Sequence, residues 1–181
     1  MFPRRRISQA NPLNPDQMAT LVKANQWVAQ GKPLEAGPLF AQVASAMQAS
    51  NHPRRAANLF TRAAHAFVDG NRGQVGLGYA RAAISLFLQT QMIGRAASFY
   101  TNITRKMAAK GMNNALGELQ KEFGAHITNL PTKPLSMPPL RRKLLPTSCP
   151  KCGAPVHMED IIWVDEATAE CEFCGSLIRS E

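Results

Sequence analysis

Short polar segments that contain glycine or proline interrupt this 181-residue chain at nearly regular intervals, from residue 15 to residue 125. Between them, apolar side chains recur at helical spacing over stretches of about 15–20 residues. The interruptions lie at residues 31–33, 50–53, 70–73, 91–94 and 110–113. A chain divided in this way is mainly α, with about six helices joined by short turns.

Large apolar residues recur on four of these stretches at nearly the same interval. The first set is spaced by roughly 20 residues, and a second set follows two helical turns later. Residues two turns apart lie on one face of a helix, so we expect both sets in the core. An interval of about 20 per helix gives about 40 per hairpin, which predicts an α-solenoid of helical hairpins. The two sets are Phe40, Phe60, Tyr79 and Tyr100, followed by Met47, Phe67, Leu86 and Met107.

The stretch from Ala56 to Tyr100 resembles tetratricopeptide-type repeats, and residues 83–86 look like the second helix of such a unit. The alanine-rich helices also resemble the helical hairpins of SNAP-type vesicle-fusion adaptors. The repeat is longer than a tetratricopeptide unit, and no closing proline follows Leu86. The resemblance covers roughly residues 15–125. It implies a helical-repeat architecture and a role in protein binding, and it assigns no individual binding residues.

The chain has four cysteines, Cys149, Cys152, Cys171 and Cys174, in the pattern C-x₂-C-x₁₈-C-x₂-C. This spacing is typical of a structural zinc site. Each C-x₂-C turn places two thiolates along one edge of a tetrahedron, and two such turns complete the coordination of one Zn²⁺ ion. A glycine follows each pair, and it allows the turn to adopt positive φ. We therefore expect one structural Zn²⁺ ion bound by these four residues.

Residues 160–165, 167–173 and 176–179 have the composition of short strands. Together with the cysteines, residues 147–180 resemble a zinc ribbon, which implies that the metal folds the module and leaves no position for a catalytic water. Three alternatives are weaker. Thioredoxin-like redox pairs need a βαβ setting, which the sequence around the cysteines lacks. Disulfides need an oxidising compartment, and no export signal is visible. A rubredoxin-like iron site usually has more residues between its two cysteine pairs.

Composition divides the chain into a flexible basic segment (1–14), a helical-repeat domain (15–126), a proline-rich basic linker (127–146) and a zinc ribbon (147–181). Asn14 and Pro15 suit the cap and the first position of the first helix. Residues 149–181 hold two basic and seven acidic residues, net −5, whereas the rest of the chain sums to +14. Opposite charges indicate two modules, and the basic linker is expected to dock on the acidic ribbon or to bind a polyanion.

Residues typical of catalysis do not cluster in the sequence. The five carboxylates of residues 1–148 form no close pair, and the glycines at 73, 76 and 78 lack the strand and lysine of a phosphate-binding loop. We expect these glycines at the start of a helix, and we expect His65 to be a packed or exposed helix residue. The remaining histidines, His52, His126 and His157, stand apart from one another. The sequence therefore predicts a protein that is not an enzyme.

Two functions fit these features. In the first, the chain is a cytoplasmic protein-interaction adaptor, whose helical repeats bind a protein partner while the ribbon adds a second contact. In the second, it is a nucleic-acid-associated protein that uses the +14 charge of its body. The adaptor is favoured because the ribbon itself is acidic and the basic residues are scattered along the helices. No stretch approaches the about 18 apolar residues of a membrane-spanning helix.

Overall fold

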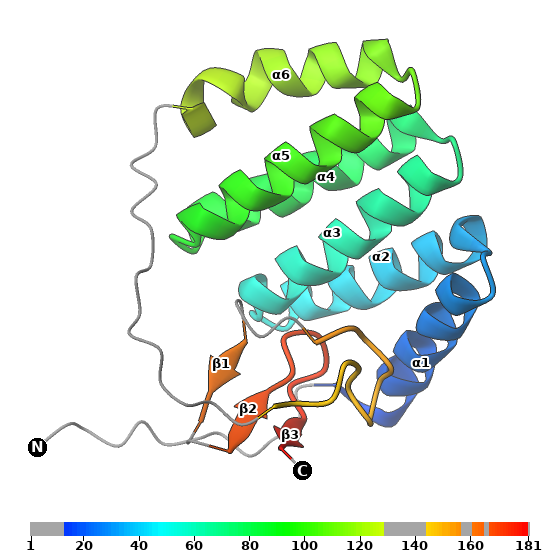
Figure 1. Cartoon of the computed structure of the whole chain (residues 1–181), viewed down its shortest axis with the longest axis vertical. Helices are drawn as coiled ribbons and strands as arrows, with labels where there is room; N and C mark the ends of the chain where they lie inside the picture. Colours follow the sequence, from blue (N-terminus) through cyan, green and yellow to red (C-terminus); the bar gives the residue numbers. More distant parts are fainter. Residues whose placement is uncertain (1–12, 129–143, 157–160, 165–166, 181) are drawn as a thin grey trace, which may run out of the picture.

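The computed structural model describes residues 13–128, 144–156, 161–164 and 167–180. Each helix packs against the next one in the chain. Figure 1 shows the helices stacked in order from α1 to α6, with the ribbon beside α1, α2 and α3. The predicted fold class is confirmed: the protein is mainly α, with helices paired in sequence order and a small β ribbon. The helices are α1 (Pro15–Ala29), α2 (Pro33–Ala49), α3 (Pro53–Asp69), α4 (Gly73–Gln89), α5 (Ile93–Ala109) and α6 (Asn113–Thr128).

One type of turn ends helices α1 to α5 and sets their period. The middle residue of each turn has positive φ, and the N–H of the next residue donates to a carbonyl near the end of the preceding helix. In the first turn this bond runs from Lys32 N to Trp27 O over 2.8 Å. This pattern is the Schellman C-cap, which satisfies carbonyls that the helix end leaves unpaired. The positive-φ residues are evenly spaced along the chain: Gly31, Asn51, Asn71, Gln91 and Gly111.

The last residue of each turn also starts the next helix. The carbonyl of Lys32 accepts the first helical bond of α2 from Ala36 N, and the later turns repeat this bond. Proline occupies the first position of α1, α2 and α3, where its missing N–H costs nothing. Asn14 caps α1 as predicted, because its side chain accepts from the backbone N–H of Gln17 over 2.8 Å.

The core contains most of the apolar residues predicted to lie in it. In α4 the buried position is one residue later than predicted, at Ala80 instead of Tyr79. Phe40, Phe60, Met47, Leu86 and Met107 are buried, as expected. The three remaining positions, Tyr79, Tyr100 and Phe67, are only partly buried.

The shift has a simple geometric cause. The constant period of the turns places Ala80, not Tyr79, at the position of Phe40 and Phe60. Neighbouring helical residues differ by about 100° around the axis, so Tyr79 turns away from the deepest core. Its ring stacks instead on Phe60 and Phe67, with centroids 6.0 and 5.3 Å away.

The ribbon contains a three-stranded antiparallel sheet of order β1-β2-β3. Its strands, β1 (Ile162–Trp163), β2 (Thr168–Glu170) and β3 (Leu177–Arg179), each fall within one of the three predicted segments. Ala169 lies at the centre of the sheet, opposite Trp163 on one side and Ile178 on the other. The predictions for residues 1–12 and 129–143 lie outside the described residues. Among the residues that the structure describes, no helix is long and apolar enough to cross a membrane.

The three glycines of α4 lie in its first turns, as predicted, and one of them permits close contact with α3. A Cβ atom on Gly76 would lie 2.7 Å from Cγ2 of Val68 and 3.2 Å from the carbonyl oxygen of Ala64. A Cβ atom on Gly78 would meet nothing within 4 Å.

We expect Gly76→Ala to lower the free energy of unfolding by about 1–3 kcal/mol, because the backbone of α4 must move away from α3. Gly78→Ala is the matched control, and it should raise stability by about 0.5–1 kcal/mol through helix propensity. Urea unfolding followed by far-ultraviolet circular dichroism measures both changes. A stabilising Gly76→Ala would contradict the close packing of α3 and α4.

Candidate metal centre

Two turns with the same backbone geometry hold the four cysteines. In the first, Gly153 N donates to Cys149 O over 2.8 Å, and in the second, Gly175 N donates to Cys171 O over 2.8 Å. The two glycines have φ of 73° and 77°, which glycine adopts without strain. The repeated turn is the feature that the glycine after each pair predicted.

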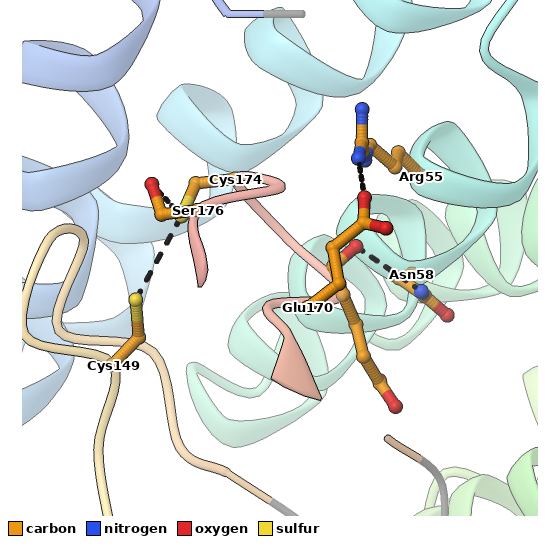
Figure 2. A network of polar contacts seen from close by, with 7 residues as sticks. Arg55, Asn58, Cys149, Glu170, Cys174 and Ser176 are labelled. Carbon is orange, nitrogen blue, oxygen red and sulfur yellow. Dashed lines mark hydrogen bonds and ion pairs between the residues drawn. The ribbon is translucent and has the colours of Figure 1, made fainter. Parts of the chain in front are cut away.

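The structure brings the four predicted ligands together. All are buried, and their Sγ atoms lie within 4.8 Å of one another. Cys149 Sγ is 3.7 Å from Cys174 Sγ (Figure 2), and Cys152 Sγ is 3.8 Å from Cys171 Sγ. A tetrahedral site with metal–sulfur bonds of about 2.3 Å has edges of about 3.8 Å. The four sulfurs therefore have the separations needed to bind one metal ion.

The sulfurs interact strongly with one another. The hydrogen bond between Cys149 and Cys152 lowers the pKa of the Cys149 thiol and raises the pKa of the Cys152 thiol. A shared proton stabilises one thiolate next to one thiol, but four thiolates this close repel each other. A bound cation removes that repulsion. Ser176 Oγ lies 3.3 Å from Cys174 Sγ (Figure 2), within range for the hydroxyl to donate to a thiolate.

A buried polar chain connects the first cysteine turn to the helices. Asn25 of α1 donates from Nδ2 to the carbonyl oxygen of Cys152. Arg62 of α3 donates from Nη2 to Oδ1 of Asn25 over 2.6 Å. The guanidinium of Arg62 also lies between two rings, 4.6 Å from the centroid of Phe40 in α2 and 5.2 Å from that of Phe173 in the ribbon. One side chain therefore joins α1, α2 and the ribbon.

Arg62 places a positive charge beside the cysteines. Burial lowers its pKa to about 10, and the nearby Cys152 and Cys171 act in the opposite direction because thiolates favour the charged guanidinium. Arg62 is therefore protonated at neutral pH. A divalent ion with four thiolates carries a net charge of about −2. With such an ion bound, the buried guanidinium would partly balance that charge, and it supports the cysteine turns through Asn25.

Two arginines at equivalent positions of successive hairpins bind two glutamates of the ribbon. Arg55 of α3 pairs with Glu170, and Figure 2 shows the two side chains pointing toward each other. Arg95 of α5 donates from both terminal nitrogens to the two carboxylate oxygens of Glu172, with 2.9 Å from Nη1 to Oε2. Asn58 supports the second contact, because it accepts from Arg95 over 3.0 Å and donates to the backbone carbonyl of Glu172 over 3.4 Å.

These helix residues form a surface that the sequence analysis missed. On α3 the polar residues are spaced alternately by three and four, which places them along one stripe. The other sides of α3 carry buried alanines and large apolar residues. This alternating spacing is the signal in the sequence that marks the stripe, although the basic residues are spread along the chain. The stripe consists of Arg55, Asn58, Arg62, His65 and Asp69. Its first three residues and Arg95 of α5 contact the ribbon, whereas His65 and Asp69 contact α5.

A hollow of about 580 Å³ lies next to the docked ribbon. Its lining includes His65 and Asp69 of α3, Phe99 and Asn102 of α5, and Glu172 of the ribbon. Residues of α1, α2 and α4, together with Pro155 and Phe173, complete the lining, so the hollow combines helices of three hairpins with the ribbon.

His65 lies inside this hollow as a half-buried residue. Its ring meets that of Phe99 edge-on with centroids 5.4 Å apart, and its Nδ1 is buried without a hydrogen-bond partner among the described residues. Burial, and next the charge of Lys106, lower the pKa of His65 to about 4, so the ring is neutral at neutral pH. His52 and His126 are exposed and do not line the hollow, and His157 is outside the described residues.

Comparisons of the chain with models of protein families, with curated proteins and with solved structures find no match. Its function must therefore be inferred from its own residues.

Cys171→Ser tests the metal centre. The variant keeps three thiolates, so we expect bound metal to fall from one ion per chain to nearly none by mass spectrometry under native conditions. The nuclear magnetic resonance signals of the ribbon should collapse, whereas the far-ultraviolet signal of the helices should persist. A full complement of metal in the variant would contradict four-cysteine coordination.

His65→Gln tests the buried histidine. The pKa of His65 is about 4 in the folded chain against an ordinary 6.5, so the unfolded chain takes up the proton first as the pH falls. Wild-type stability should therefore decrease between about pH 6.5 and pH 4, by up to about 3 kcal/mol from this group. The variant should lack the part of this loss of stability that comes from protonation of His65. Urea unfolding of both proteins at pH 7 and pH 4.5 measures it, and equal losses in the two proteins would contradict it.

Proposed function

We propose that this chain is a non-enzymatic, cytoplasmic protein-interaction adaptor whose partner binds the hollow beside the ribbon. The observation that carries this proposal is the composition of the hollow: helices of three successive hairpins and the ribbon all contribute to it. Its lining combines an aromatic side chain, Phe99, with polar ones such as Asn58 and Asn102, a composition that suits the binding of a partner.

The helical body supports the same function. Hairpins joined by identical turns form an extended surface to which several helices contribute, and repeat proteins use such surfaces to bind other proteins. The resemblance to tetratricopeptide and SNAP-type hairpins points in the same direction.

We further propose that the metal is zinc and that its role is structural. Four cysteines complete a tetrahedral shell with no open position, which is the typical arrangement of structural zinc. The ribbon is too short to build a sufficient core of its own, so the metal supplies much of its stability. By fixing Cys152 and Cys171, zinc also holds Glu170 and Glu172 in place against the helices.

The nucleic-acid alternative has less support. Arg55 and Arg95 pair with glutamates of the ribbon, and Arg81 of α4 pairs with Glu118 and Glu122 of α6. Charges paired within the chain contribute little to the binding of phosphates.

Asn102→Arg tests the adaptor function. Asn102 is exposed and lines the hollow, so a long charged side chain there should block a partner. Thr101→Arg is the matched control, because Thr101 is also exposed on α5 but does not line the hollow. We expect affinity capture from native lysate, with nuclease present and at about 200 mM salt, to retain specific proteins with wild type and Thr101→Arg and to lose them with Asn102→Arg. Equal capture by the two variants, or loss of all material on nuclease treatment, would contradict the proposal.

A further inference from the structure

The ion pairs between ribbon and helices differ from the other ion pairs of the described chain in their burial. The side chains of Arg95 and Glu172 are 16% and 11% exposed, and those of Arg55 and Glu170 are 19% and 30% exposed. By contrast, Arg81 and its two glutamates are 39% to 48% exposed. Breaking a buried pair by removing one partner leaves a desolvated charge, which is strongly unfavourable. When the ribbon leaves, water reaches both arginines again, and they become two exposed positive charges that an acidic segment can bind.

The repeat geometry matches the spacing of the glutamates. Arg55 and Arg95 are one hairpin apart, and each is the third residue of its helix, α3 or α5. Glu170 is the last residue of β2, and Glu172 begins the turn that follows Cys171, yet both carboxylates reach arginines of the helices. Cys171, between them, brings its sulfur to the other three. The segment thus presents carboxylates to the helices and a metal ligand to the ribbon.

The position of Cys171 links binding of the segment to the metal. Because Cys171 lies between the two glutamates, its coordination fixes the backbone that carries both carboxylates. Without metal the ribbon loses its main source of stability, and the order of the segment is lost with it. Ordering a disordered segment on the helices costs conformational entropy, so the contact weakens.

From these observations we infer that residues 170–172 are a metal-dependent internal ligand of the helices, and that metal loss allows Arg55 and Arg95 to bind an acidic segment of another protein in which one residue separates two glutamates. The inference rests on the proposed adaptor function for the identity of the partner as a protein. The release of the internal segment is a property of this chain alone and is measured without that partner.

The test uses a fluorescein-labelled synthetic peptide of residues 167–176, with serine in place of both cysteines, and the full-length chain. We expect the peptide to bind metal-free chain, prepared with a chelator and a reducing agent, at least about tenfold more tightly than metal-loaded chain. The double variant Glu170→Gln, Glu172→Gln should bind the peptide tightly even with metal bound, because it lacks the competing carboxylates. Fluorescence anisotropy reports each affinity.

Two controls make the outcome specific. The double variant Glu118→Gln, Glu122→Gln also removes two carboxylates that pair with an arginine, Arg81, but this pair joins α4 to α6. It should bind the peptide as wild type does. The double variant Arg55→Gln, Arg95→Gln should abolish peptide binding in the metal-free chain, with its helical signal in circular dichroism unchanged.

Three results would overturn the inference: equal affinity with and without metal, binding that survives the loss of both arginines, or no binding to any form of the chain. These results are separable from those of the partner-capture experiment. If the peptide binds more tightly without metal but no protein is captured from lysate, the adaptor function is refuted and the metal-dependent contact stands. If protein is captured but peptide affinity does not depend on metal, only the metal-dependent contact is refuted.

Discussion

The Schellman turn between the helices is the constraint on which the rest of this structure depends. It ends one helix with a positive-φ residue, starts the next helix directly afterwards, and recurs at a constant interval along the chain. Because the turn has the same length each time, the residues of α1, α3 and α5 keep the same orientation through the stack. Only with such a fixed period can Arg55 and Arg95, on successive hairpins, face the same neighbour.

The period also explains how a small metal module becomes part of a helical protein. Asn25, Arg62 and Arg95 belong to three different helices, yet each contacts the ribbon or a residue that does. Arg62 has the most demanding position, since its charge is buried between two aromatic rings next to the metal ligands. A buried charge is tolerated only with compensation, so the ribbon and the helices depend on each other at this point.

The sequence was most informative where local chemistry decides the structure. The cysteine spacing and the glycine after each pair predicted the ligand turns, and the breakers between apolar stretches predicted the helices. Prediction was weaker where the evidence is long-range. Tyr79 and Ala80 are adjacent, and the large side chain is the stronger signal of a core position in the sequence, although the period favours the alanine. The pairing of Arg55 with Glu170 joins residues 115 apart, and no local rule connects them.

The opposite charges of the two parts of the chain acquire a structural explanation from these contacts. A body of +14 and a tail of −5 first indicated separate modules and a polyanionic partner. In the structure, part of that positive charge faces part of that negative charge across a partly buried interface. Complementary charge selects the right neighbour and its register more than it adds net stability. The charge asymmetry therefore first serves to dock the acidic ribbon on the basic helices of the same chain. Arg55 and Arg95 can bind another acidic segment only when Glu170 and Glu172 no longer occupy them.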